Sequence, residues 1–248
     1  MAYSMVHIAP FILGQLEMEV FNELGRRTGY IRHFHENGQL KSQGNYVNGQ
    51  LSGDLTVFFA DGSIQAEYHY ANGLKTGKNL EYFENGDLKI ESDHSRNGSQ
   101  VTVKEFWGNG EVKSLTYLVN GNPDGEWTYF DDRGRELLTE NYLDGVLHGA
   151  RMIYERGVLT RSENYLFGKK NGEFIEYYSR RKVKLRATYK LDFLTGPYIK
   201  FHDNGEPEYT GQYVRNERHG PWTFFDRRGN VLRSVTYELG TQIESSDQ

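Results

Sequence analysis

Aromatic residues recur along this chain with a period of 24 residues. Counting from Gly29, the fifth following position is aromatic in each of nine successive units. A second position, about twelve residues further on, is tyrosine in seven of them. Apolar and polar residues alternate around both positions, which predicts short strands, and the first column predicts a continuous aromatic spine. The first column consists of Phe34, Phe58, Tyr82, Phe106, Phe130, Tyr154, Tyr177, Phe201 and Phe225.

Turn sequences separate these aromatic positions. One turn lies between the two columns, as in Asn37-Gly38, and a second closes each unit, as in Asn48-Gly49. Asn-Gly is a strong hairpin signal because both central residues of a type I′ turn need a positive φ. The spacing leaves five to seven residues per strand, which is an ordinary strand length. We therefore expect an all-β fold, an elongated and twisted single antiparallel sheet of about nine tandem 24-residue hairpin repeats.

The unit-start glycines define the domain organisation. They fall on a grid that is interrupted only at Val101 and shortened by one residue before Gly172. The repeat array is expected to cover residues 29–240. Residues 1–28 are expected to form an N-terminal cap or a degenerate half-repeat, because an array otherwise ends in an open sheet edge. Residues 241–248 are polar and are expected to form a disordered tail.

The repeat resembles a known family. The pattern G-x-W-x-x-[YF]-[YF]-x-x-x-G-x-[LV] is clearest from Gly125 and from Gly220, and it resembles the variant MORN repeat over roughly residues 29–240. Bacterial proteins built wholly of such units are commonly antitoxin-like or immunity proteins that neutralise a toxin encoded beside them. Other MORN-type proteins are scaffolds or membrane-associated modules. The resemblance therefore implies a protein-binding role and leaves both classes open.

The composition limits which cellular compartment and which class of partner suit the chain. The chain has 248 residues and no cysteine, which excludes disulfides and thiolate metal sites. No apolar run approaches the roughly 20 residues that span a bilayer, and the first 20 residues lack a signal-peptide pattern. We expect a cytoplasmic protein. A net charge of −5 and a pI near 5.9 argue against a nucleic-acid partner.

Charge is distributed unevenly along the repeats. Residues 77–148 carry a net charge of −7, whereas residues 149–196 carry +6. An acidic stretch could mimic nucleic-acid phosphates and cover the basic active-site cleft of a nuclease toxin. The alternative is a solvated sheet face with local fluctuation in charge. The candidate partner-binding residues are Glu81, Glu84, Asp87, Glu91, Asp93, Trp107, Asp131 and Asp132.

Other clusters have weaker functional interpretations. The basic run Arg180–Arg186 could meet phosphates or an anionic membrane, but its alternation is also typical of a half-exposed strand. His33 and His35 supply two metal ligands at most. Asp131, Asp132 and Asp144 lack the spacing of a calcium loop. We therefore expect neither a metal ion nor a cofactor.

Nothing in the sequence marks a catalytic centre. There is no cysteine nucleophile and no G-x-S-x-G motif, and the glycines lie at hairpin turns. An active site is one asymmetric constellation, which a repeat array does not favour. We therefore expect a non-enzymatic immunity or antitoxin protein that occludes a co-encoded toxin with a basic surface. A scaffold or membrane-associated module is the main alternative, and an enzyme acting on glycans or polymers is a distant one.

Overall fold

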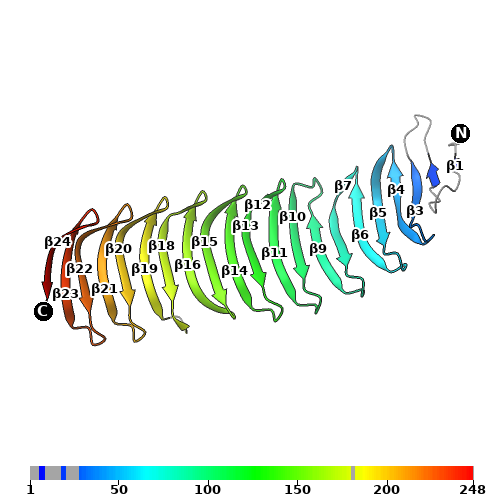
Figure 1. Cartoon of the computed structure of the whole chain (residues 1–248). Coiled ribbons are helices and arrows are strands. Elements are labelled where there is room, and N and C mark those ends of the chain that lie inside the picture. Colours follow the sequence, from blue (N-terminus) through cyan, green and yellow to red (C-terminus); the bar gives the residue numbers. More distant parts are fainter. Residues whose placement is uncertain (1–5, 9–17, 21–27, 180–181, 248) are drawn as a thin grey trace. The chain divides into compact units, whose positions relative to one another are not determined.

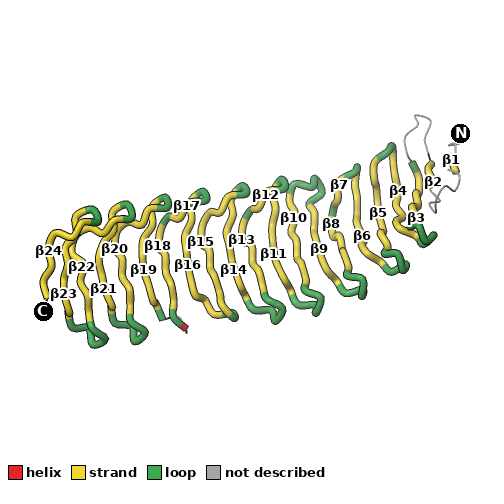
Figure 2. Tube along the Cα trace, in the orientation of Figure 1, coloured by secondary structure: helices red, strands yellow, loops and turns green. Residues whose placement is uncertain are grey.

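The structure is a computed structural model that describes residues 6–8, 18–20, 28–179 and 182–247. The chain divides into two units, residues 1–122 with 132–134, and residues 123–131 with 135–248. The described residues contain no α-helix. In each unit, successive strands pair in antiparallel fashion (Figures 1 and 2). The prediction of an all-β protein made of hairpins is confirmed.

The first unit holds strands β1 to β11, and β12 (Asn122–Pro123) lies at the boundary between the units. Most of these strands have six to nine residues, so several exceed the five to seven that the turn spacing predicts. Their bounds are β1 Val6–Ile8, β2 Met18–Val20, β3 Gly29–Phe34, β4 Leu40–Val47, β5 Gln50–Phe58, β6 Ile64–Ala71, β7 Leu74–Lys75, β8 Gly77–Tyr82, β9 Leu88–His94, β10 Gln100–Phe106 and β11 Val112–Val119.

The second unit continues the same hairpin pattern from β13 to β24. The strands are β13 Gly125–Phe130, β14 Glu136–Leu143, β15 Val146–Glu155, β16 Val158–Leu166, β17 Lys169–Lys170, β18 Gly172–Tyr177, β19 Val183–Lys190, β20 Phe193–Phe201, β21 Pro207–Val214, β22 Glu217–Phe225, β23 Val231–Glu238 and β24 Thr241–Asp247.

The two kinds of turn differ in backbone conformation. In the closing turn, Asn48 and Gly49 both have positive φ values of 52° and 85°, as a type I′ turn requires. In the opening turn only Gly38 has a positive φ, and its amide donates to the carbonyl of His35. This is a type I turn followed by one left-handed residue. The type I′ prediction is therefore right for closing turns such as Asn48-Gly49 and wrong for opening turns such as the one at Gly38.

The two irregularities of the glycine grid have local causes. Between β15 and β16 the opening turn is the two-residue pair Arg156-Gly157, both with positive φ, which removes one residue from that unit. Before Val101 the closing turn is a longer loop, in which the Gly98 amide donates to the Ser95 carbonyl. Val101 can then pair with His94 as ordinary extended backbone, so no glycine is needed there.

In each unit the side chains with the least exposure form one row, whereas Thr128 and Thr139, each 9% exposed, are buried on the opposite side. The residues of the row lie at the second position after each unit start and at the residue paired with it, as in Ile31 opposite Gly44 and Trp222 opposite Val235. Ile31 and Trp222 are both 0% exposed. Directly paired residues point to the same side of a sheet. We call this side of each unit face A and the opposite side face B.

The predicted aromatic spine lies elsewhere and is less buried than expected. All nine residues of that column are only half-buried. Tyr82 belongs to face B, because its hydroxyl donates to Glu67, whereas Tyr68 next to Glu67 donates to Glu81 on face A. Burial and the hydrogen bond to Glu67 raise the pKa of Tyr82 to about 12. The column is therefore a half-exposed stripe on face B, and the core is the face A row.

Aromatic packing on face A is densest around Trp222 in the second unit. The indole ring lies 5.1 Å from the ring of Tyr213, 5.9 Å from Tyr198 and 6.0 Å from Tyr209. These tilted and edge-on arrangements are the favoured ones for aromatic pairs. The indole also covers Gly211, where an added Cβ would lie 2.3 Å from the ring atoms. Gly211 is therefore required by packing.

The predictions for the two ends of the chain differ in outcome. The predicted disordered tail is wrong for Thr241–Asp247, which form β24 and pair with β23. Leu239 and Gly240 make one more closing turn, and the free edge of β23 supplies backbone partners for a polar segment. The predicted N-terminal cap falls mostly on residues outside the described ranges. Only Val6–Ile8 and Met18–Val20 are described there, as a short antiparallel pair.

Candidate functional site

The predicted acidic residues do not gather on one surface. Glu81 lies on face A, because it pairs with the core residue Ala66. Glu91 and Asp93 flank the face A residue Ser92, so they point to face B. Glu84 and Asp87 lie in the exposed opening turn between β8 and β9. The sequence places these carboxylates close together along the chain, but the strand geometry divides them between two faces and an edge.

Several of these residues also have local partners. Glu91 forms an ion pair of 3.1 Å with Lys78, and Asp131 forms one of 2.6 Å with Arg135. Lys113 lies 5.4 Å above the half-buried ring of Trp107. Asp132 is exposed, and its carbonyl oxygen accepts a hydrogen bond from the Asn109 side chain. The ion pairs of Glu91 and Asp131 neutralise part of the negative charge that the sequence predicts to face a partner.

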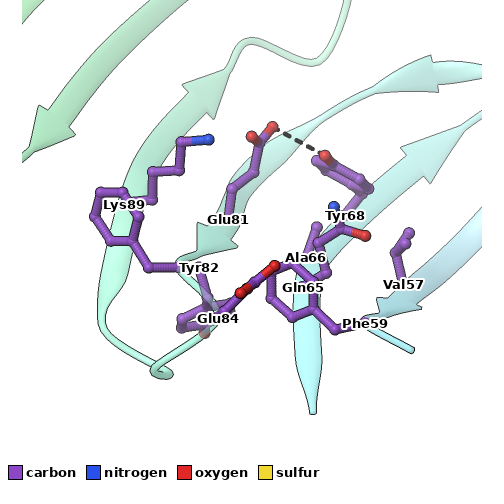
Figure 3. Close-up of a pocket in the computed structure, with 10 residues that line it drawn as sticks. Val57, Phe59, Gln65, Ala66, Tyr68, Glu81, Tyr82, Glu84 and Lys89 are labelled. Atoms are coloured by element: carbon purple, nitrogen blue, oxygen red, sulfur yellow. Dashed lines mark hydrogen bonds between the residues drawn. The ribbon is translucent and has the colours of Figure 1, made fainter. Parts of the chain in front are cut away.

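Two of the predicted residues line an open pocket in the first unit. Glu81 and Glu84 border a cavity of about 330 Å³ together with Tyr68, Phe59 and Lys89 (Figure 3). The Tyr68 hydroxyl donates a 2.9 Å hydrogen bond to Glu81. Burial, reinforced by that carboxylate, raises the pKa of Tyr68 above its usual value. We call this cavity the Glu81–Lys89 pocket.

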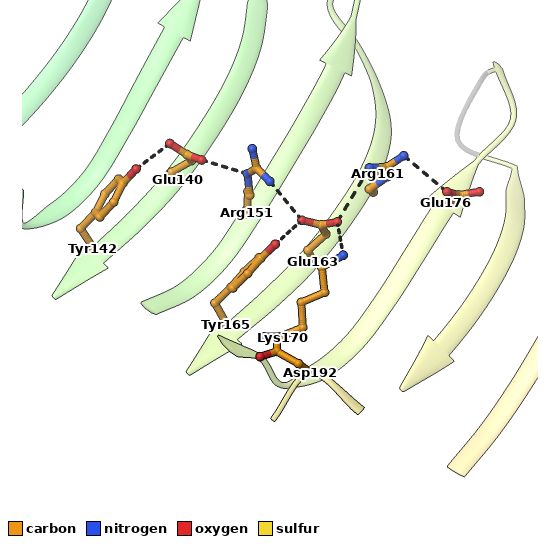
Figure 4. Close-up of polar contacts among 9 residues, drawn as sticks. All are labelled: Glu140, Tyr142, Arg151, Arg161, Glu163, Tyr165, Lys170, Glu176 and Asp192. Atoms are coloured by element: carbon orange, nitrogen blue, oxygen red, sulfur yellow. Dashed lines mark hydrogen bonds and ion pairs between the residues drawn. The ribbon is translucent and has the colours of Figure 1, made fainter. Parts of the chain in front are cut away.

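A buried ionic cluster in the second unit was not predicted. Glu163 is only 2% exposed, and it accepts hydrogen bonds from Tyr165 at 2.8 Å and from Lys170 at 3.1 Å (Figure 4). Arg151 lies between two carboxylates, 3.4 Å from Glu163 and 2.9 Å from Glu140. We call Glu140, Arg151, Arg161, Glu163 and Lys170 the Glu163 cluster.

The Glu163 cluster replaces the aromatic core in that part of the sheet. Arg151 occupies the face A position that holds Trp127 one repeat earlier, and Glu163 and Glu140 occupy its paired positions. Burial alone would raise the pKa of Glu163, but the Tyr165 hydroxyl, Lys170 and Arg151 outweigh it and lower the pKa. Aligning the repeats by number would have revealed this substitution of charge for apolar residues. Within the cluster two carboxylates meet three basic groups, and Arg161 also pairs with Glu176 at 3.5 Å. The charges thus have local partners, and the cluster is a structural element.

Basic side chains lie over aromatic rings at an equivalent point of three repeats, two residues after the closing turn. Lys75 Nζ lies 3.6 Å from the centre of the Tyr68 ring. Lys170 Nζ lies 5.2 Å from the Phe174 ring, and Arg218 Cζ lies 4.4 Å from Trp222. Burial lowers the pKa of Lys75. These cation–π contacts cover the rims of the face A core.

The closing turns of the second unit carry exposed apolar residues in strained positions. Phe167, Leu191 and Leu239 occupy the first turn position with φ values of 47°, 50° and 45°. The equivalent turns of the first unit have Asn48, Asn72 and Asn120 there, and asparagine tolerates the left-handed region far better. Phe167 is 64% exposed. We call the exposed apolar residues at this edge the turn-edge row: Leu143, Val146, Phe167, Leu191, Phe193, Val214 and Leu239.

The weaker candidates of the sequence analysis have structural partners. His35 Nε2 lies 3.0 Å from the carbonyl oxygen of Phe58 in the next repeat. In the basic run, Lys184 pairs with Glu176 at 3.5 Å and Arg186 pairs with Glu173 at 3.0 Å. These cross-strand pairs agree with a half-exposed strand. Arg180 and Arg181 lie outside the described residues.

Comparison with protein families identifies the repeat. Residues 27–48, 75–95, 194–215 and 218–239 match a family model described as MORN repeat variant. The chain is therefore a MORN-repeat protein, as the sequence resemblance indicated. Such repeats point to a repeat-based protein-interaction module. No curated protein matches the chain.

Solved structures with some likeness to the chain are remote. The crystal structure of TcdB2-TccC3 is 12% identical and has a TM-score of 0.21, covering 89% of this chain and 15% of that chain. A porin-like protein from Bacteroides uniformis is 13% identical with a TM-score of 0.17, covering 94% of this chain and 87% of its own. The chain thus spans a small part of the first of these proteins. Likeness at this level carries no argument about function.

The search for membrane-spanning helices gave a negative result. In the part of the chain that the structure describes, no helix has the length and apolar character needed to cross a bilayer.

Proposed function

We propose that this chain is an immunity or antitoxin protein that neutralises a co-encoded toxin in the cytoplasm. It acts by tight one-to-one binding that occludes the active site of the toxin, and it catalyses no reaction itself. The observation that carries the proposal is the turn-edge row of the second unit, in which apolar side chains project from strained turns into solvent.

The turn-edge row is energetically unfavourable for the isolated protein. A left-handed φ disfavours phenylalanine and leucine, and side chains that stay largely exposed return little burial energy. Asparagine at the same turn position would serve the fold better, as the first unit illustrates with Asn48. Strained residues without a structural return are typical of functional surfaces. Contiguous exposed apolar side chains on a polar protein commonly mark a protein interface.

The geometry of the row suits an extended interface. Successive closing turns are two strands apart, which corresponds to about 10 Å between their tips. A partner that contacts Phe167 and Leu191 together would bury one aromatic and one aliphatic side chain, and the binding energy of an interface is usually concentrated in a few such buried residues. A standard interface covers about 800 Å² on each partner, so only some of the repeats would take part.

The acidic residues of the first unit support a partner with a positively charged surface. Glu84 lines the pocket together with Glu81, and Asp87 lies in the same exposed opening turn as Glu84. Exposed carboxylates guide the approach of a positively charged surface and raise its association rate. A nuclease toxin presents such a surface, because its active-site cleft binds phosphates. This agrees with the resemblance of the repeat to those of bacterial immunity proteins.

The test is co-purification of the tagged full-length protein from its native host, compared with a variant that carries Phe167→Asn and Leu191→Asn. We expect one basic protein at one-to-one stoichiometry, encoded beside the bait, and its loss in the double variant. A matched control, Asn48→Phe, alters the same turn position in the first unit and should keep the partner. Recovery of anionic lipid or of several unrelated proteins would instead favour a membrane-associated or scaffold module.

A further inference from the structure

An oppositely charged pair recurs at fixed repeat positions, with one member on face A and the other at the register shift of the following strand. The fourth and twelfth residues after the unit start have opposite charge in four repeats of the array. Three of these pairs are closed ion pairs, with distances of 3.1, 3.5 and 3.0 Å between charged atoms. They are Glu105 with Lys113, Glu176 with Lys184, and Lys200 with Glu208.

The fourth pair, Glu81 with Lys89, is open. Glu81 accepts its hydrogen bond from Tyr68 instead, and Lys89 Nζ lies 5.8 Å from the centre of the Phe83 ring. No ion pair joins the two side chains, and the Glu81–Lys89 pocket lies beside them (Figure 3). The sequence alone would predict a closed pair here, as in the sibling repeats. The open pair therefore distinguishes this repeat from the others.

The walls of the pocket define what it can hold. Two carboxylates, Glu81 and Glu84, line it, and Lys89 is the one basic residue among the lining residues. The lining thus carries one more negative than positive charge, although Lys75, which is not part of the lining, also interacts electrostatically with Glu81. The rings of Phe59 and Phe83 also line it, and a planar guanidinium can stack on aromatic rings while its N–H groups bond to a carboxylate. An ammonium ion would gain the charge interaction but would match the flat walls less well.

We propose that the Glu81–Lys89 pocket binds the guanidinium group of an arginine side chain presented by the protein partner. Glu81 and Glu84 accept its hydrogen bonds, and the phenylalanine rings contact its flat faces. Lys89 acts as an internal competitor that partly neutralises the empty site. The arginine belongs to the toxin only if the proposed function holds, but recognition of the guanidinium group does not depend on the identity of the partner.

The test uses a short peptide as the probe. Acetyl-Gly-Arg-Gly-amide is titrated into the full-length protein, and side-chain and backbone NMR shifts report saturable binding, with acetyl-Gly-Gln-Gly-amide as the uncharged control. We expect the arginine peptide to bind in the millimolar range, as suits one side chain. The double variant Glu81→Gln, Glu84→Gln should weaken binding at least about tenfold, because each charge-assisted hydrogen bond is lost. Glutamine at position 81 can still accept from Tyr68, so the fold is retained.

Two further variants make the test specific. Lys89→Met should strengthen binding severalfold, since it removes the competing charge. Glu105→Gln changes the same repeat position in a closed pair and should leave binding unchanged. The proposal is overturned if the arginine peptide does not saturate, if the double variant binds it equally well, or if Lys89→Met weakens it. Failure to recover a one-to-one toxin would overturn the proposed function but not peptide binding, so the two failures are distinguishable.

Discussion

Phe167→Asn should make the protein more stable and at the same time a weaker partner. The phenylalanine backbone is held at a φ of 47°, where an L-residue other than asparagine or aspartate is disfavoured by about 1–2 kcal/mol. Asparagine removes most of that cost. Its side chain replaces a ring that is 64% exposed, so little buried surface is lost.

One contact opposes this gain. The Phe167 ring lies 4.8 Å from the His148 ring in an edge-on arrangement, and such a pair contributes about 0.5–1.5 kcal/mol. With the middle of each range, about 1.5 kcal/mol of strain minus about 1 kcal/mol of contact, the net effect is a stabilisation of roughly 0.5 kcal/mol. The free energy of unfolding in urea measures it, and the reverse substitution Asn48→Phe should destabilise by a similar amount.

Binding gives the second readout of the same variant. If the ring is retained for a partner, Phe167→Asn should weaken the complex at least about tenfold, which is about 1.4 kcal/mol. Isothermal titration with the purified partner measures this. A loss of stability greater than about 1 kcal/mol would refute the reasoning, because the ring would then be a packing residue whose position the fold itself requires.

Other residues give independent predictions. Gly211→Ala should destabilise the second unit by about 1–3 kcal/mol in denaturant unfolding, because its methyl group would overlap the Trp222 indole. Phe130→Ala should cost less than the 3–5 kcal/mol of a fully buried ring, since that side chain is half-buried. Glu163→Gln should cost about 3 kcal/mol at neutral pH, as it leaves buried cations unpaired. The folded pKa of Glu163 is lowered, so this difference should be full above the ordinary value of 4.5 and vanish as pH falls through the lowered pKa. A pH-independent difference would show that ionised Glu163 is not what stabilises the cluster.

The sequence predicted what depends on local chemistry. The period, the strands and the closing turns follow from glycine, asparagine and alternation, all of which act over a few residues. The core was misplaced because residue type alone does not say which face of a strand is covered. Phe130 and Trp127 are both aromatic, and only the register shows that Trp127 belongs to the face A row.

The candidate site was harder to predict because sequence neighbours in a strand point in opposite directions. Glu91 and Asp93 were grouped with Glu81 on proximity along the chain, but one residue of offset moves a side chain to the other face. The strain at Leu191 and the open pair at Glu81 depend on φ angles and on competing hydrogen bonds, which a one-dimensional pattern does not contain.

A residue that is the same in every repeat and a residue that differs in one repeat need different explanations. A position that is the same in every unit is explained by the fold, because each unit solves the same packing problem. A position that changes in one unit at a cost needs another explanation. Phe167 replaces a favourable asparagine, and Glu81 gives up an ion pair that Glu105 keeps. The Phe167 ring gains one edge-on contact with His148 but stays 64% exposed, and Glu81 exchanges its ion pair for a hydrogen bond from Tyr68. A partner that covers the apolar edge of the second unit would recover the cost at Phe167, and one that presents a cation to the first unit would recover the cost at Glu81, which is why we propose these two departures as interaction surfaces.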